Sequence, residues 1–262
     1  MSLSLQLGRR GLVKQLRESD LDEAPLLFQA ASSSSIECLK LVSDEIWNSL
    51  GEAELRQQLL AKDLKGKTIV FHAARSQNLD VFEAVLRAVE KGEKRGNESW
   101  LTTVPRGQPS GNTVNDDKEF VVDLKERTVL HHACQAGCTA IVRRVIKEAN
   151  SHGVTFLRRF LNRPDCLGRT AVMHVLRSNR DDVLKKIETL LKLMTPEEKI
   201  TAFTQPTKGF ASTALVHAVH GGSKNIEIAR RKILELAPEM RNADGELDLD
   251  AALGIKEISS DK

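Results

Sequence analysis

Residues 131–138 place two adjacent histidines, His131 and His132, close to two cysteines, Cys134 and Cys138. Imidazole nitrogens and thiolates are ligands that zinc prefers. His131, Cys134 and Cys138 would share one helical face only if the helix continued through Gly137, a residue that typically ends helices. A fourth ligand is also missing. We therefore interpret the stretch as structural and predict neither a metal ion nor a cofactor.

A second histidine pattern runs along the chain. A histidine stands four residues after each of four threonines: His72 after Thr68, His132 after Thr128, His174 after Thr170 and His217 after Thr213. At about 100° per residue, the fourth, seventh and eighth positions share a narrow helical face, which we predict to be a polar stripe. Either the imidazoles fit a half-buried structural position, or the row binds a metal or small molecule.

Other catalytic patterns are missing from the sequence. The segment AKDLKGKT, residues 61–68, satisfies a loose phosphate-binding pattern, but a helical sequence precedes it where that loop needs a strand. DLKER and DCLGR occupy the same place further along the chain without the pattern. No nucleophile is paired with a base, so we predict that the chain is not an enzyme.

The histidines belong to a repeated unit. Four segments align on a threonine, beginning TIVFHAAR, TVLHHACQ, TAVMHVLR and TALVHAVH, and a weaker copy begins at Leu26. A turn such as DLKGK precedes the threonine, whose hydroxyl can cap a short helix. Small residues and then a second apolar helix follow. One such helix pair cannot bury its own apolar face, so the copies must stack.

This unit resembles the ankyrin repeat, with the best match from Asp123 to Ile146. The threonines are 60, 42 and 43 residues apart, whereas the standard repeat has about 33. Segments such as SLGEAELRQQLLAKD, VTFLRRFLNRPD and TPEEKITAFTQ account for the extra length as a third helix. Ser49 with Glu52, and Thr195 with Pro196, mark two of their starts. An all-α, ankyrin-like solenoid is therefore expected, with a HEAT-like or armadillo-like solenoid as the alternative.

We expect one domain over residues 1–262. It comprises a degenerate copy at about 1–22, clear repeats at about 24–236 and a closing copy or tail at 237–262. Residues 91–120 are rich in Gly, Asn, Ser and charge, which predicts a mobile surface insertion. Trp100 in this insertion either anchors it or offers an exposed aromatic contact.

Bulk properties indicate a water-soluble chain. Charged residues make up 29%, the net charge is +3, and no apolar stretch is long enough for a membrane helix. That charge does not indicate nucleic-acid binding. The N-terminus lacks the apolar core of a secretory signal, and the four cysteines suit a reducing compartment. We expect a cytoplasmic monomer, with the nucleus left open.

The resemblance implies a non-catalytic module that binds a protein partner of unknown identity on a concave face of turns and first helices. That face would be basic and would favour an acidic segment. The predicted contact residues are His72, Arg75, His132, Gln135, His174, Arg177, His217 and His220 on the helices, Lys65, Lys67, Lys125, Arg127, Arg169 and Lys208 in the turns, and Trp100. Protonation of the histidines near pH 6.5 would strengthen the attraction.

Overall fold

The computed structural model describes residues 11, 13–17, 20–92, 100–103, 119–208, 212–242 and 244–248. Over these residues the chain is all-α, as predicted. The exception is an antiparallel pair of two-residue strands, β1 (Thr102–Thr103) and β2 (Glu119–Phe120). No helix in the described ranges is long and apolar enough to cross a membrane.

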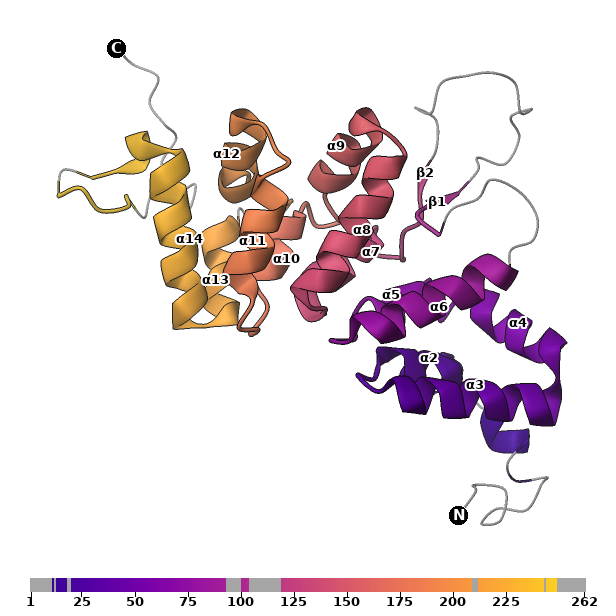
Figure 1. Ribbon diagram of the computed structural model, residues 1–262. Helices are drawn as coiled ribbons and strands as arrows, with labels where there is room; N and C mark the ends of the chain where they lie inside the picture. The colour runs from indigo at the N-terminus through magenta and orange to yellow at the C-terminus, as the bar shows by residue number, and fades with distance from the viewer. Residues whose placement is uncertain are drawn as a thin grey trace. The chain divides into compact units, whose positions relative to one another are not determined.

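The chain divides into two compact units between Leu124 and Lys125. The first unit contains α2 (Leu26–Ser32), α3 (Ile36–Leu50), α4 (Glu52–Leu60), α5 (Ile69–Ala73), α6 (Leu79–Gly92) and the two strands (Figure 1). The second contains α7 (Val129–Ala136), α8 (Thr139–Ser151), α9 (Val154–Asn162), α10 (Ala171–Leu176), α11 (Val183–Leu191), α12 (Pro196–Thr204), α13 (Ala214–Gly221), α14 (Ser223–Leu236) and the 3₁₀ helix η2 (Pro238–Met240). That the two units act as one domain stays a prediction.

The predicted helix pairs and third helices are present. The pairs are α2 with α3, α5 with α6, α7 with α8, α10 with α11, and α13 with α14, while α4, α9 and α12 are the third helices. Helix α12 begins with the predicted Thr195 cap, whose hydroxyl accepts from the Glu198 amide at 3.3 Å. The predicted cap at Ser49 is wrong: Gly51 precedes α4, and the Ser49 hydroxyl donates to Glu45 in the preceding helix.

Short first helices pack against each other in sequence. Helix α5 contacts α2 in the first unit, and α10 contacts both α7 and α13 in the second. Fully buried small residues such as Ala133 and Ala218 allow this close approach. A side chain at Gly221 would place its Cβ 2.1 Å from the Leu176 carbonyl oxygen and 2.2 Å from Asn225 Nδ2. Glycine is therefore required where α13 meets the end of α10.

Both ends of the described chain continue the pattern. Residues 13–17 are helical, and the Gln58 amide nitrogen donates to the carbonyl oxygen of buried Leu16 at 3.1 Å. The degenerate copy at about residues 1–22 stays a prediction. Beyond η2, the chain turns back at Asn242, and Arg241 forms a β-bridge with Leu247. Within the predicted insertion, residues 93–99 and 104–118 lie outside the described ranges, as do residues 249–262 of the C-terminal segment.

Candidate functional site

An aspartate organises the turns before α5 and α10. Asp63 Oδ1 accepts hydrogen bonds from the Lys65 amide at 2.9 Å and the Lys67 amide at 2.8 Å. Asp165 Oδ1 accepts in the same way from Leu167 at 3.0 Å and Arg169 at 2.9 Å. Gly66 and Gly168 supply the positive φ angles, 72° and 80°, that this turn needs. In AKDLKGKT, residues 61–68, the Asp63 carboxylate therefore already accepts the backbone amide hydrogens that a phosphate would need.

The same turn occurs where no threonine marks it. Asp20 Oδ1 accepts from the Asp22 and Ala24 amides at 2.9 and 3.0 Å, before Pro25 at the start of α2. Asn242 Oδ1 accepts from the Asp244 and Glu246 amides at 3.1 and 2.9 Å. The alignment on threonine missed the first of these turns. An Asp or Asn three residues before a positive-φ position, Glu23 or Gly245, is the signal they share.

Backbone hydrogen bonds connect successive turns. In the first unit the Leu64 amide donates to the Asp22 carbonyl at 2.8 Å, and the Leu124 amide donates to the Lys65 carbonyl at 2.9 Å. In the second unit Cys166 donates to Lys125 at 2.9 Å and Lys208 to Leu167 at 2.8 Å. Each bond fixes the register of one turn against the next, so equivalent tip residues lie along one edge within each unit.

Two of the recurring histidines, His72 and His174, bond to the turn aspartate nine residues before them. His72 Nε2 lies 3.0 Å from Asp63 Oδ2, and His174 Nε2 lies 3.1 Å from Asp165 Oδ2. Gln29 makes the equivalent bond to Asp20 Oδ2 at 3.3 Å. Each side chain thereby fastens a first helix to its own turn. His132, His174 and His217 are buried and His72 is largely so, and the prediction that they form an accessible polar stripe is wrong.

Burial also changes how these histidines titrate. It lowers the pKa of His72 and of His174, against the opposing effect of the partner aspartate. Burial and then the nearby Arg169 charge lower the pKa of His217 to about 4. Burial therefore favours the neutral form of these three imidazoles, because each would have to carry its charge inside the protein. The lowered pKa of His72, His174 and His217 opposes the predicted gain of positive charge near pH 6.5.

His131 has the structural role that we expected. Its Nδ1 accepts a hydrogen bond from the Thr128 amide at 3.0 Å, and its ring packs edge-on against His174 at 5.0 Å between centroids. Helix α7 ends before Gly137, which separates Cys134 from Cys138. Burial raises the pKa of the Cys134 thiol to about 12. In the described ranges, no group of three or more His, Cys, Asp or Glu side chains is placed to hold a metal ion.

A buried lysine in α11 is also structural. Lys186 is fully buried, and its ammonium lies 3.0 Å from Asp182 Oδ1. The other Asp182 oxygen accepts from the amide and the hydroxyl of Thr139, both at 2.7 Å. Burial raises the pKa of Asp182, but the hydrogen bonds from Thr139 and Lys186 outweigh it and lower that pKa overall. The pair joins α11 to the start of α8.

The remaining predicted contact residues divide by exposure. Exposed are Lys65, Arg75, Lys125, Arg177, Lys208 and His220; half-buried are Gln135, Arg127 and Arg169; Lys67 and Trp100 are buried. Trp100 packs edge-on against Phe82 of α6 at 5.9 Å between centroids. It anchors its segment, and the alternative of an exposed aromatic contact is wrong. The exposed tryptophan is Trp47, beside a pocket of about 380 Å³ that Leu55 and Arg56 also line.

Sequence reasoning also missed the apolar tips of the turns. Leu21, Leu64 and Leu124 each follow the turn aspartate directly and are 100%, 54% and 75% exposed. The repeated Asp-Leu dipeptide was the available signal, because a leucine inside a tight turn has no core to enter. Lys65 lies beside Leu64 and forms an ion pair with Asp22.

Comparison of this chain with protein-family models finds no match, and a search of curated proteins finds none either.

Proposed function

We propose that this chain is a non-catalytic protein-interaction module, an ankyrin-like helical solenoid that binds a partner segment along the turn edge and the first helices. Support for the ankyrin-like reading comes from the repeated Asp-centred turn, the N-cap threonine and the stacked short helices. A HEAT-like or armadillo-like arrangement has no counterpart to this turn and accounts for fewer of these features.

The observation that carries the proposal is the row of exposed leucines in the first unit. Leu21, Leu64 and Leu124 hold equivalent positions in three successive turns that backbone hydrogen bonds keep in register. Scattered exposed leucines are ordinary, whereas a repeated apolar row along one edge is typical of an interaction surface. The row needs a partner segment with apolar side chains.

Charge gives the proposed partner its second property. The exposed cations are Lys65 and Arg75 in the first unit, and Lys125, Arg177 and Lys208 in the second. They lie in the turns or at the ends of first helices. An apolar segment with acidic residues would match the leucines together with Lys65 and Arg75 of the first unit.

Affinity capture with paired variants tests this function. The triple variant Leu21→Ser, Leu64→Ser and Leu124→Ser should lose proteins that the unaltered chain retains from a cell lysate. The matched control changes Leu41, Leu60 and Leu193 to serine, since these leucines are also exposed but lie outside the turn tips. Equal retention by both variants, with circular dichroism showing both folded, contradicts the proposed surface.

The acidic character of the partner has a separate test. Arg75→Glu combined with Arg177→Glu should weaken binding of a captured protein and leave the melting temperature nearly unchanged. Binding that is unaffected by this charge reversal shows that neither arginine contacts an acidic segment of the partner.

A further inference from the structure

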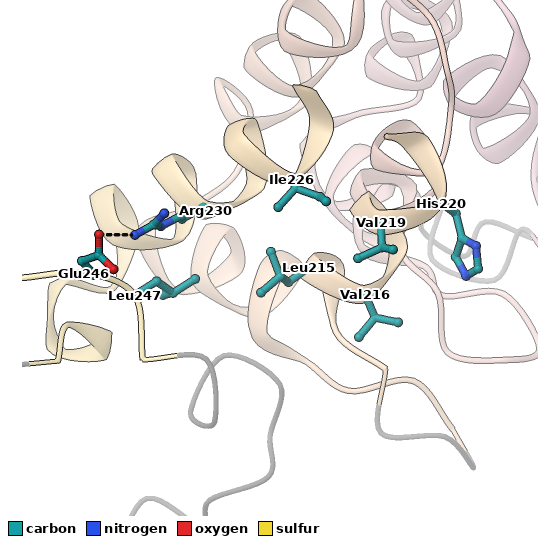
Figure 2. A pocket seen from close by; sticks show the side chains of 8 residues that line it. All are labelled: Leu215, Val216, Val219, His220, Ile226, Arg230, Glu246 and Leu247. Carbon is teal, nitrogen blue, oxygen red and sulfur yellow. Dashed lines mark ion pairs between the residues drawn. The ribbon is translucent and has the colours of Figure 1, made fainter. Parts of the chain in front are cut away.

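An apolar pocket of about 660 Å³ lies at the last helix pair of the second unit (Figure 2). Helix α13 contributes Leu215, Val216, Val219 and His220, helix α14 contributes Ile226 and Arg230, and the turn that follows contributes Glu246 and Leu247. Arg230 and Glu246 form an ion pair of 3.1 Å at one side. Five of these eight side chains are aliphatic.

The exposed residues of this pocket occupy positions that other copies bury. The sixth residue after the helix N-cap is Ala31 in α2, Cys134 in α7 and Leu176 in α10, and each is 0% exposed. In α13 the same position is Val219, which is 60% exposed. Helices α2, α7 and α10 are each followed by a first helix that packs against them. Among the described residues, α13 has no such successor.

The third position after the N-cap gives the same result. Phe28, His131 and Met173 hold it in α2, α7 and α10, and all are buried. In α13 it is Val216, which is only half-buried. The third and sixth positions therefore face the next first helix, and in α13 they form the wall of the pocket.

The turn beside this pocket resembles the turns that precede first helices. Asn242 forms the turn that precedes first helices, and Leu247 follows it by five residues, as Thr68 follows Asp63. The Asp248 amide donates to the Met240 carbonyl at 2.8 Å, which holds this point of the chain against η2. Leu247 itself lines the pocket. The next residues, LDAALGIKEI at 249–258, therefore start at the pocket's edge.

The register of that segment fits α13. Counted from Leu247, Leu249 and Ala252 take the second and fifth positions, which are the buried Val172 and Val175 in α10. By the same count, the two outward positions, the third and the sixth, fall on Asp250 and Leu253. A polar residue at the third position is expected of a copy that ends a stack, because its outer face meets water.

We propose that residues 249–258 of this chain occupy the pocket as a closing first helix and cover Val216 and Val219 of α13. No linker has to be spanned, so the docking is intramolecular and is favoured by a high effective concentration. The proposal does not depend on the partner-binding face. A second copy of the chain and a helix from another protein are the competing occupants.

Hydrogen exchange in α13 tests the proposal on the full chain. Leu249→Asp and, separately, Val219→Asp should each raise the exchange rates of the Ala214–Gly221 amides by about tenfold or more, because either change removes the cover. The control variants are Ser259→Asp, directly after the segment, and Val154→Asp, since Val154 is also a mostly exposed valine of the second unit. Neither control should alter exchange in α13. The proposal is overturned if, in the full chain, Val219→Asp leaves the exchange rates of the α13 amides as unchanged as Val154→Asp does.

A chain that stops at Asp248 separates the possible occupants. It should show the same fast exchange in α13, and Val219→Asp should have little further effect in it. A synthetic peptide of residues 249–262 should restore protection, and the same peptide with Leu249→Asp should not. Protection that persists in the shortened chain and grows with protein concentration assigns the pocket to a second copy and overturns the proposal.

Discussion

Replacing Asp165 with asparagine should separate the turn from the histidine bond. Asparagine keeps an oxygen for the Leu167 and Arg169 amides, as Asn242 does naturally in its own turn. It loses the carboxylate oxygen that accepts from Arg169 Nε at 2.7 Å and from His174 Nε2 at 3.1 Å. The turn should therefore form, while the buried His174 and the half-buried Arg169 lose their acceptor.

The size of the effect follows from these two bonds. A hydrogen bond to a charged group contributes about 1.5–3 kcal/mol. Arg169 can recover part of its loss from water, so we expect Asp165→Asn to lower the free energy of unfolding by about 3–4 kcal/mol. For a chain of this length that corresponds to a fall in melting temperature of roughly 6–15 °C.

Urea denaturation followed by circular dichroism at pH 7 measures this change. Asp181→Asn is the control, because Asp181 is a fully exposed aspartate of the same unit, and a change within about 0.5 kcal/mol is expected for it. His174→Gln should cost less than Asp165→Asn, since Gln29 makes the equivalent bond to Asp20. A cost for Asp165→Asn no larger than that of the control would refute the role assigned to the aspartate–histidine bond.

Three further predictions concern acid stability, packing and proteolysis. Burial lowers the pKa of His217 to about 4, so its neutral form stabilises the fold above the ordinary pKa of about 6.5, and that stability is lost as the pH falls toward 4. His217→Leu should therefore reduce the difference in unfolding free energy between pH 7 and pH 4 by up to about 3 kcal/mol. An unchanged difference contradicts this. Gly221→Ala should destabilise the chain by about 2–4 kcal/mol, because the added Cβ clashes with Leu176 and Asn225. Gly153→Ala should cost only about 1 kcal/mol in thermal melts, because its Cβ would meet open space and only the φ of 101° is unfavourable. Limited proteolysis should first cut within residues 91–120 and leave two fragments that stay associated; a first cut between residues 165 and 195 argues against the repeat assignment.

The sequence alone determined the local elements. Apolar periodicity and capping residues predicted the helix pairs and the third helices, because helix starts and stops depend on residues within one or two turns of each other. Thr195 and Pro196 marked the start of α12 correctly for this reason. Ser49 does not mark the start of α4, because α3 continues to Leu50 and Gly51 alone separates the two helices.

Only the tertiary structure decided what the repeated side chains do. The sequence shows a histidine four residues after each threonine, but the bond from His174 to Asp165 requires the first helix to fold back over its own turn. Likewise, Trp100 is buried because α6 supplies Phe82, and Val219 is exposed because no further first helix packs on α13 among the described residues. The burial and the pKa of a side chain depend on neighbours that are distant in sequence. A repeat pattern shows which residues are equivalent, but not which of them are in contact.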